Sequence, residues 1–410
     1  MPRTTYFNVH EHVVPGCHVR EYPGITSTQQ EDVIRLHVKQ YTPWIQPQGR
    51  AVTLIAMHGL GFPKARSSLY EASSANGHSI RGIWVADMAQ MGMSGVLNES
   101  IMDVDGTWMD HSRDVLLIIN HFRNEMPRPL VGIGHSCGAV QLCNLSFMHP
   151  RLFNSLMLLD PAFLTSEKGE VLCQERNFNM TIQSRDLWNS RVEAAAHVES
   201  AFPTWNPRVR ELMVRYGFRD LPTALYPNFP AGADAETRPV TLTTTKYHMA
   251  SMLWRSLSDC ERTNGRFVVN RQTHGDLDPE LSVSSGYRPE VSSSTARMPS
   301  LRPPTLFLLG RHTNGPWRGA MKRAADSTGT GVGGSGGKPE GRVQTVWMEG
   351  GHMFPFTAVE ETGLACASWL GTEMERYGEE ETRWEERRKL SGGERALLRR
   401  SFQGLLDSKL

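Results

Sequence analysis

Short apolar runs recur along the chain and are separated by segments with helical periodicity. Residues 33–39 alternate apolar and polar side chains, which predicts a strand with one solvated face. The other runs are almost continuously apolar, as is typical of buried strands in a parallel sheet. They cover residues 51–57, 83–86, 130–133, 156–159, 305–309 and 343–347, with helical patterns between them, for example over residues 109–122 and 356–377. This alternation predicts an α/β fold with a mostly parallel sheet flanked by helices.

The alternation stops after residue 159 and resumes at residue 304. An insertion of this size between two strands is most simply a cap over one edge of the sheet. We therefore predict a core in two parts, a helical cap insertion (called the insertion below) and a charged C-terminal tail. These cover residues 1–160 and 303–377 for the core, 161–302 for the insertion, with helical patterns over 186–202, 207–216 and 246–259, and 378–410 for the tail.

Two segments of biased composition are predicted as loops. Residues 282–300 are rich in Ser and residues 328–341 are rich in Gly. The Gly-rich segment contains Lys338, but a phosphate-binding loop requires Gly where Val332 stands and Ser or Thr where Pro339 stands. We interpret it as a flexible connection.

The charge balance excludes several classes of partner. The chain has 44 Lys and Arg against 43 Asp and Glu, so a net charge of +1 provides no field that would gather nucleic acid or favour a membrane surface. No run approaches the roughly 20 apolar residues of a membrane span, and the first residues contain no apolar signal core. The six cysteines form no C-x-x-C pair, which predicts reduced thiols and neither a zinc site nor a disulfide framework.

Two clusters resemble metal sites without the required pattern. His10 and His12 lack the i, i+4 spacing of a zinc-binding helix, and His274, Asp276 and Asp278 have no obvious further ligands. We interpret both clusters as polar surface and predict no metal and no cofactor.

The last three residues, Ser408, Lys409 and Leu410, form a peroxisomal address when the terminus is free. They follow a charge-rich stretch, residues 379–400, which would let them protrude. We therefore predict a peroxisomal location, with these three residues binding the peroxisomal import receptor.

The pattern G-x-S-x-G occurs twice, and only one copy has the context that gives it meaning. The copy around Ser335 lies in the Gly-rich connection with no strand before it. The copy around Ser136 follows the apolar run 130–133 and opens a helix, which is the strand-to-helix turn that exposes a nucleophilic serine. Cys137 stands one residue past the apex of this turn and is a much poorer candidate for the nucleophile.

A serine hydroxyl needs a histidine base and a carboxylate that orients it. His352 follows the last predicted strand and is the first choice for the base, with His312 as the alternative. The turn after residues 305–309 contains no carboxylate, so the acid must come from elsewhere, and Asp160 directly follows the run 156–159. The alternatives for the acid are Asp87, Asp276 and Asp278. For the oxyanion, the backbone N–H groups of Leu60 and Cys137 are the natural pair of donors.

Longer motifs resemble the fungal peroxisomal α/β-hydrolases of secondary-metabolite pathways, the family of the acyl-CoA hydrolase of mycophenolic acid biosynthesis and of the AK-toxin hydrolase. The similarity covers nearly the whole chain. It is carried by His12-Val-Val-Pro15, Arg20-Glu-Tyr-Pro23, Trp108-Met-Asp-His111, the segment from Met126 to Ser136, Leu158-Leu-Asp-Pro161 and Val240-Thr-Leu-Thr-Thr244.

The resemblance implies an α/β-hydrolase fold and a triad of Ser136, Asp160 and His352 that hydrolyses a CoA thioester to a free acid in the peroxisome. The chain departs from the family at Cys137, where a bulkier residue is usual, so the acyl substrate does not transfer with the chemistry. We expect Trp188, Trp205 and Trp254 of the insertion to form much of an apolar acyl pocket. An ester or lactone hydrolase or an acyltransferase using the same triad is the alternative, and the intact triad argues against a third reading, a non-catalytic binding module. The sequence leaves open whether two copies form a homodimer.

Overall fold

The computed structural model of the chain describes residues 6–45, 47, 51–60, 79–164, 168–229, 238–257, 260–264, 266–278 and 286–396. An eight-stranded sheet forms its centre, in the order β1-β2-β4-β3-β5-β6-β14-β15. The first two strands are antiparallel to their neighbours, and all other pairs are parallel. The strands are β1 (Phe7–Pro15), β2 (Arg35–Pro43), β3 (Ala51–Met57), β4 (Ser79–Ala86), β5 (Leu130–His135), β6 (Ser155–Leu159), β14 (Thr305–Gly310) and β15 (Val343–Met348).

The prediction of an α/β fold with a mostly parallel sheet is confirmed, and every apolar run that predicted a strand forms one. β1 was missed because its polar centre was interpreted as a surface cluster. Val9 and Val14 are buried, and the His12 ring stacks 5.6 Å from the Trp84 ring. His12 therefore packs against apolar side chains at the face of the sheet.

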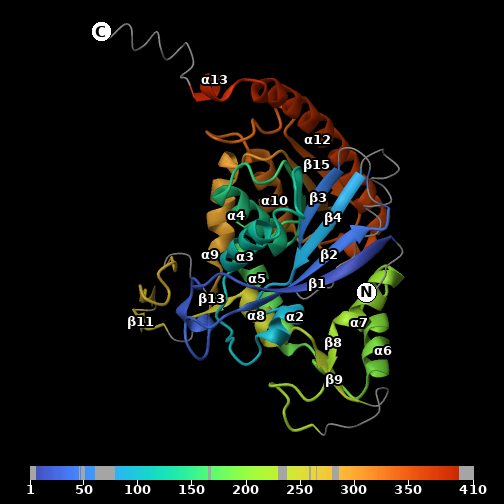
Figure 1. Cartoon of the computed structure of the whole chain (residues 1–410). Helices are drawn as coiled ribbons and strands as arrows, with labels where there is room; N and C mark the ends of the chain where they lie inside the picture. The colour runs from blue at the N-terminus through green and yellow to red at the C-terminus, as the bar shows by residue number, and fades with distance from the viewer. Residues whose placement is uncertain are drawn as a thin grey trace.

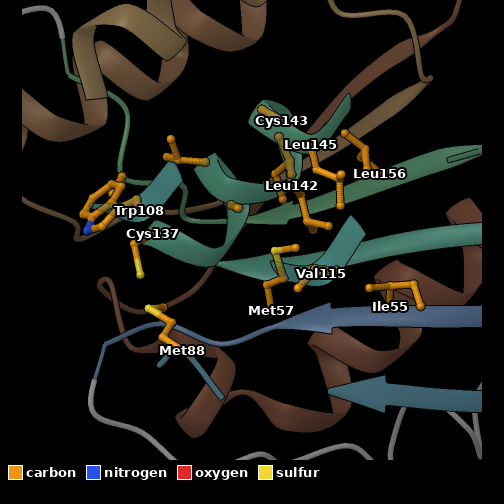
Figure 2. Close-up of a cluster of buried hydrophobic side chains, with 14 of the residues drawn as sticks. Ile55, Met57, Met88, Trp108, Val115, Cys137, Leu142, Cys143, Leu145 and Leu156 are labelled. Carbon is orange, nitrogen blue, oxygen red and sulfur yellow. The ribbon is translucent and has the colours of Figure 1, made fainter. Parts of the chain in front are cut away.

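Helices cover both faces of the sheet (Figure 1). On one face, side chains of α3 (Trp108–His121), α4 (Cys137–Met148) and α10 (Gly315–Ser327) join the sheet in a large apolar cluster, part of which Figure 2 shows. On the other face, α12 (Val359–Arg388) buries Cys366, Trp369 and Leu370 against the central strands. The sequence predicted this last helix only as far as residue 377, so the first part of the predicted tail is helical. α12 is followed by α13 (Gly392–Ala396).

The segment between β6 and β14 contains its own elements, several of which gather at one end of the molecule (Figure 1). A three-stranded sheet packs with two helices there, and Trp188, Val198 and Phe218 lie in their shared apolar cluster. The elements are α5 (Lys168–Gln183), β7 (Leu187–Trp188), α6 (Arg191–Ala201), α7 (Pro207–Tyr216), β8 (Phe218–Asp220), β9 (Val240–Leu242), α8 (Lys246–Leu253), β10 (Arg255–Ser256), β11 (Arg262–Thr263), β12 (Arg266–Phe267), β13 (Gly286–Tyr287) and α9 (Pro289–Arg297), with a short 3-10 turn at Met298–Ser300.

The loop prediction was wrong for part of the Ser-rich segment, whereas the Gly-rich segment forms no helix or strand, as predicted. Part of the Ser-rich segment forms α9, because Pro289 at its first position favours helix initiation and Val291 is buried against α4. The Gly-rich segment is a series of turns held by backbone hydrogen bonds, including Gly331 N–H to Pro299 O at 2.8 Å and Ser335 N–H to Leu301 O at 3.1 Å. Several of its glycines, among them Gly329 and Gly336, occupy positive φ values that such turns favour, so it is a fixed connection.

Among the described residues, no helix is both long enough and apolar enough to cross a membrane.

Candidate active site

Ser136 lies at a sharp turn between β5 and α4. Its φ of 57° and ψ of −123° are values that residues other than glycine rarely adopt, and such strain is characteristic of functional turns. The flanking glycines make room for it: a Cβ on Gly134 would lie 2.7 Å from the backbone of Ala139, and one on Gly138 would lie 2.4 Å from the Met57 carbonyl oxygen. The hydroxyl is therefore held where β5 ends, in front of the N-terminus of α4.

His352 lies in the loop after β15, and its imidazole faces this serine. Nε2 is 3.0 Å from Ser136 Oγ, and Nδ1 is 2.8 Å from Asp160 Oδ2. Because an ionised carboxylate only accepts hydrogen bonds, Nδ1 carries the proton and Nε2 accepts from the serine hydroxyl. The structure therefore brings the three residues predicted for the triad into hydrogen-bond distance of one another, in the order that acyl transfer requires.

Asp160 directly follows β6 and is fully buried, with a φ of 40°. Its Oδ1 accepts a hydrogen bond from the Gly310 N–H at 2.7 Å. Its Oδ2, which faces His352, also accepts from Thr313 Oγ1 at 2.8 Å. Gly310 is the last residue of β14, and Thr313 lies in the turn that follows, where the sequence contains no carboxylate. This turn therefore orients an acid that comes from the neighbouring strand.

We predict that Thr313→Val lowers kcat about tenfold or more with little change in KM, because a buried carboxylate loses one of its hydrogen-bond donors. Thr313→Ser keeps the hydroxyl and is expected to restore most of the activity. Thr328→Val is a matched control, since the buried Thr328 hydroxyl bonds only to its own helix carbonyl, Ala324 O, at 2.7 Å. Steady-state kinetics on the three variants test this, and equal losses in Thr313→Val and Thr328→Val would contradict it.

The alternative residues for the triad lie in other surroundings. His312 is exposed, and its Nε2 is 2.6 Å from Glu349 Oε1. Asp87 Oδ2 is 3.3 Å from His37 Nδ1, at the end of β4. Asp276 accepts a hydrogen bond from the Tyr287 hydroxyl at 2.6 Å within the insertion. None of these contacts includes Ser136 or His352.

The two residues predicted as oxyanion donors lie on adjacent strand ends. β3 and β5 pair in parallel, with Met57 opposite Gly134. The loop after β3 passes close to the serine, since a Cβ on Gly59 would lie 3.3 Å from Ser136 Cβ. Leu60 is in this loop and is the last described residue before the next gap, and Cys137 is the first residue of α4. Both residues therefore lie in segments beside the serine.

The Cys137 side chain is buried and faces the same loop. Its thiol lies 3.9 Å from the His58 carbonyl oxygen. Burial raises the pKa of this thiol to about 12, so it stays protonated near neutral pH. A protonated thiol is a poor nucleophile, which leaves the hydroxyl of Ser136 as the reacting group.

Sequence reasoning missed two residues that touch the site. Thr313 was overlooked because the search after β14 was for a carboxylate, although a hydroxyl in that turn is the signal that the acid lies elsewhere. His135 is the first variable residue of G-x-S-x-G, and its Nε2 is 2.9 Å from the carbonyl oxygen of His352. Nothing in the sequence distinguishes it from an ordinary residue before the nucleophile.

Within the described part of the chain, no group of three or more His, Cys, Asp or Glu residues is arranged to hold a metal ion. In the cluster predicted as polar surface, Asp276 and Asp278 are exposed, whereas His274 is buried; Asp276 accepts a hydrogen bond from the Tyr287 hydroxyl and faces Arg255 Nη1 at 3.3 Å. These contacts of Asp276 join separate parts of the insertion to one another.

Comparison with known proteins places the chain among fungal enzymes. It is 42% identical over 408 residues to the type I acyl-CoA thioesterase mpaH' of Penicillium brevicompactum, covering 94% of this chain and 92% of that protein. It is 43% identical over 404 residues to the type I acyl-CoA thioesterase mpaH of Penicillium roqueforti, covering 93% and 92%. The chain belongs to the family of these type I acyl-CoA thioesterases.

Shorter and structural similarities agree with this family. Abhydrolase domain-containing protein AFT2-1 of Alternaria alternata is 29% identical over 153 residues, which are 37% of this chain and 55% of that protein. The solved structure of the peroxisomal alpha-beta-hydrolase Lpx1 of Saccharomyces cerevisiae superposes with a TM-score of 0.64 at 15% identity, covering 97% of this chain and 100% of that chain. No family model matches the sequence. The fold is therefore that of the α/β-hydrolases, as the sequence resemblance implied, and the protein is a hydrolase.

Proposed function

We propose that this hydrolase cleaves the CoA thioester of a bulky secondary-metabolite acyl-CoA and releases the free acid. The observation that carries the proposal is the hydrogen-bonded set Ser136–His352–Asp160, with contacts of 3.0 and 2.8 Å, in a chain so similar to type I acyl-CoA thioesterases over its whole length. The nearly complete coverage of those relatives supports a shared reaction class.

In the proposed mechanism, Ser136 Oγ attacks the thioester carbonyl carbon while its proton passes to His352 Nε2. The carbonyl oxygen becomes an oxyanion, which the N–H groups of Leu60 and Cys137 stabilise. Collapse breaks the carbon–sulfur bond, and CoA leaves as a thiol with the proton from His352. Water then attacks the acyl-enzyme with His352 again as the base, which yields the free acid and restores Ser136. Asp160 keeps the proton on Nδ1 throughout.

The acyl pocket differs in part from the sequence expectation. Trp188 packs in the core of the insertion, with its ring 4.9 Å from the Phe218 ring, so we do not place it in the pocket. Met252 of the insertion joins the apolar cluster that contains Cys137, Met88 and Trp108, and the Trp108 Nε1–H donates to its carbonyl oxygen at 2.8 Å. We propose that the acyl group binds beside these residues, of which Figure 2 labels Met88, Trp108 and Cys137.

The alternative is an ester or lactone hydrolase, or an acyltransferase, that uses the same groups on a pathway intermediate. Both classes need the same triad and oxyanion donors, so these features favour neither. A thiol with a pKa of about 8.5 leaves more readily than an alcohol, so discrimination among thioesters must come from the acyl side.

A panel of acyl-CoAs and matched oxoesters tests this choice. We predict a kcat/KM for bulky, partly aromatic or polyketide-like acyl-CoAs at least about 100-fold above that for acetyl-CoA, since each buried methylene contributes about 0.8 kcal/mol. Thiol release from CoA, measured with a chromogenic disulfide, gives the rates. Equal activity on acetyl-CoA, or a clear preference for an oxoester over its thioester, would favour the alternative.

We further propose that the enzyme works in the peroxisome. The proposal rests on Ser408, Lys409 and Leu410, which lie outside the described residues. Deleting these three residues is expected to move a fluorescently tagged protein from peroxisomes to the cytosol, with unchanged kcat and KM for the purified enzyme, because three terminal residues contribute little to a core. Peroxisomal fluorescence that survives the deletion would exclude this tail as the address.

A further inference from the structure

The segment that carries His352 begins with two glycines, and the carbonyl oxygen of the first, Gly350, accepts a hydrogen bond from the His312 N–H at 2.9 Å. Gly350, with a φ of 109°, and Gly351 precede the histidine, and glycines allow many backbone conformations. On the other side, α11 (Phe354–Thr357) begins two residues later. The ring of His352 must nevertheless keep contact with both Ser136 and Asp160. Its position therefore depends on what packs against the His352 backbone and against α11.

His135 makes the first of these contacts. Its Nε2 lies 2.9 Å from the His352 carbonyl oxygen, and its ring centroid is 4.9 Å from that of His352. Burial lowers the pKa of His135 to about 3, so the ring is neutral near neutral pH, and the proton is on the nitrogen that faces the carbonyl. A Cβ on Gly59 would lie 2.8 Å from His135 Nδ1, so the loop after β3 closes against the opposite edge. The His135 ring therefore lies between the His352 backbone and this loop.

Aromatic rings continue from His135 into the insertion. The rings of His135 and Phe356 are perpendicular, with their centroids 5.6 Å apart, and Phe356 stacks on Trp205 with the centroids 5.1 Å apart. Trp205 in turn stacks on Phe202 at 4.1 Å, at the end of α6. The backbone is joined at the same place, because the Asn206 N–H donates to the Phe356 carbonyl oxygen at 2.8 Å. We call the rings of Phe202, Trp205, Phe356 and His135 the aromatic column.

We propose that Trp205 is a positioning residue for His352, acting through Phe356 and His135, so that the insertion holds the catalytic base in place. The proposal rests on the proposed function only in taking His352 as the base. Trp205 is buried and packs with Phe356 and Val209 in a small cluster that joins the insertion to the segment after β15. A misplacement of a reacting group by about 1 Å can lower a rate about 100-fold. A small displacement of these rings that moves His352 is therefore expected to lower turnover strongly.

The test compares Trp205→Ala and Trp205→Phe with Trp188→Ala as the matched control. Trp188 is as buried as Trp205, but its ring contacts the rings of Phe218 and His197, which both lie inside the insertion. Each variant is assayed with p-nitrophenyl acetate and with the best acyl-CoA of the panel above. We expect Trp205→Ala to lower kcat about 10- to 100-fold on both substrates with KM changed less than about threefold. Trp205→Phe, which keeps a stacking ring, should restore most of the rate.

The choice of two substrates separates positioning from pocket shape. A residue that only shapes the acyl pocket would change KM for the large acyl-CoA and leave p-nitrophenyl acetate unaffected. The proposal is overturned if Trp205→Ala shows that pattern, or if it loses no more kcat than Trp188→Ala at a temperature where both are folded. Thermal unfolding of each variant sets that temperature.

A second pair keeps the test decisive if Trp205→Ala does not fold. His135→Gln retains an N–H donor for the His352 carbonyl oxygen, whereas His135→Leu removes it, so the first should keep clearly more kcat than the second. Equal kcat in the two would overturn the proposal. If the unchanged protein hydrolyses p-nitrophenyl acetate but no acyl-CoA, the proposed thioesterase function fails, while the comparison of variants on the acetate still tests the positioning role.

Discussion

Ser136→Ala and His352→Ala are each expected to lower kcat by about 10⁴ or more, and the double variant should be little worse than either one. Without the Oγ there is no nucleophile, and without the imidazole, which lies 3.0 Å from that Oγ, the hydroxyl keeps its proton. Either loss disables the same step, so the second adds almost nothing. The residual rate reflects binding and the oxyanion donors alone. Single-turnover and steady-state kinetics on the same acyl-CoA measure all three variants.

The chain contains matched controls for both substitutions. Ser335→Ala changes the serine of the other G-x-S-x-G copy, which lies in the fixed Gly-rich connection, and His312→Ala changes an exposed histidine paired with Glu349. Both are expected to keep kcat within about twofold, as surface changes away from a site do. Losses that multiply in the Ser136 and His352 double variant would show that these residues do not act as one unit.

The central strands could be predicted from the sequence because the residues that form them are apolar on both faces. Residues 51–57 and 156–159 are buried whichever way they point, so their composition alone identifies them. β1 could not be predicted from the sequence, because its histidines and glutamate face polar and aromatic neighbours that come from distant parts of the chain. Part of the Ser-rich segment was taken for a loop because serine is a weak helix former, whereas α9 is stabilised by the burial of Val291 and Ser294.

The candidate site could be predicted from the sequence where the order of residues along the chain and the residue types at turns determine it. G-x-S-x-G after a strand located Ser136, and a histidine after the last strand located His352. No carboxylate follows β14, and Asp160 was favoured because it stands at the end of another predicted strand. The structure adds that Gly310, the last residue of β14, and Thr313 in the next turn donate hydrogen bonds to Asp160. The aromatic column was not predictable, since Trp205 and Phe356 are 151 positions apart by their numbering and meet only through the packing of the insertion.

Asp160→Asn is the second substitution with a large expected effect, a loss of about 10⁴ in kcat with the fold intact. The asparagine can keep its oxygen toward the Gly310 N–H, which donates at 2.7 Å to Oδ1 of the present carboxylate. Its amide nitrogen then faces the Thr313 hydroxyl, which can turn and accept. The same amide donates toward His352 Nδ1, so the imidazole proton moves to Nε2, the nitrogen that must accept from Ser136. The site is filled and hydrogen-bonded, but the base is in the wrong tautomer.

Asp160→Asn is therefore expected to keep the geometry of the site and to change only the position of the imidazole proton. Thermal unfolding of Asp160→Asn should stay close to that of the unchanged protein, while kcat/KM collapses on every substrate in the panel. Asp87→Asn, at a carboxylate that faces His37, and Asp278→Asn, at a carboxylate in the insertion, should cost far less. If Asp160→Asn retains most of its activity while one of these two does not, the acid is the other residue, and the turn formed by Gly310 and Thr313 orients Asp160 for structural reasons alone.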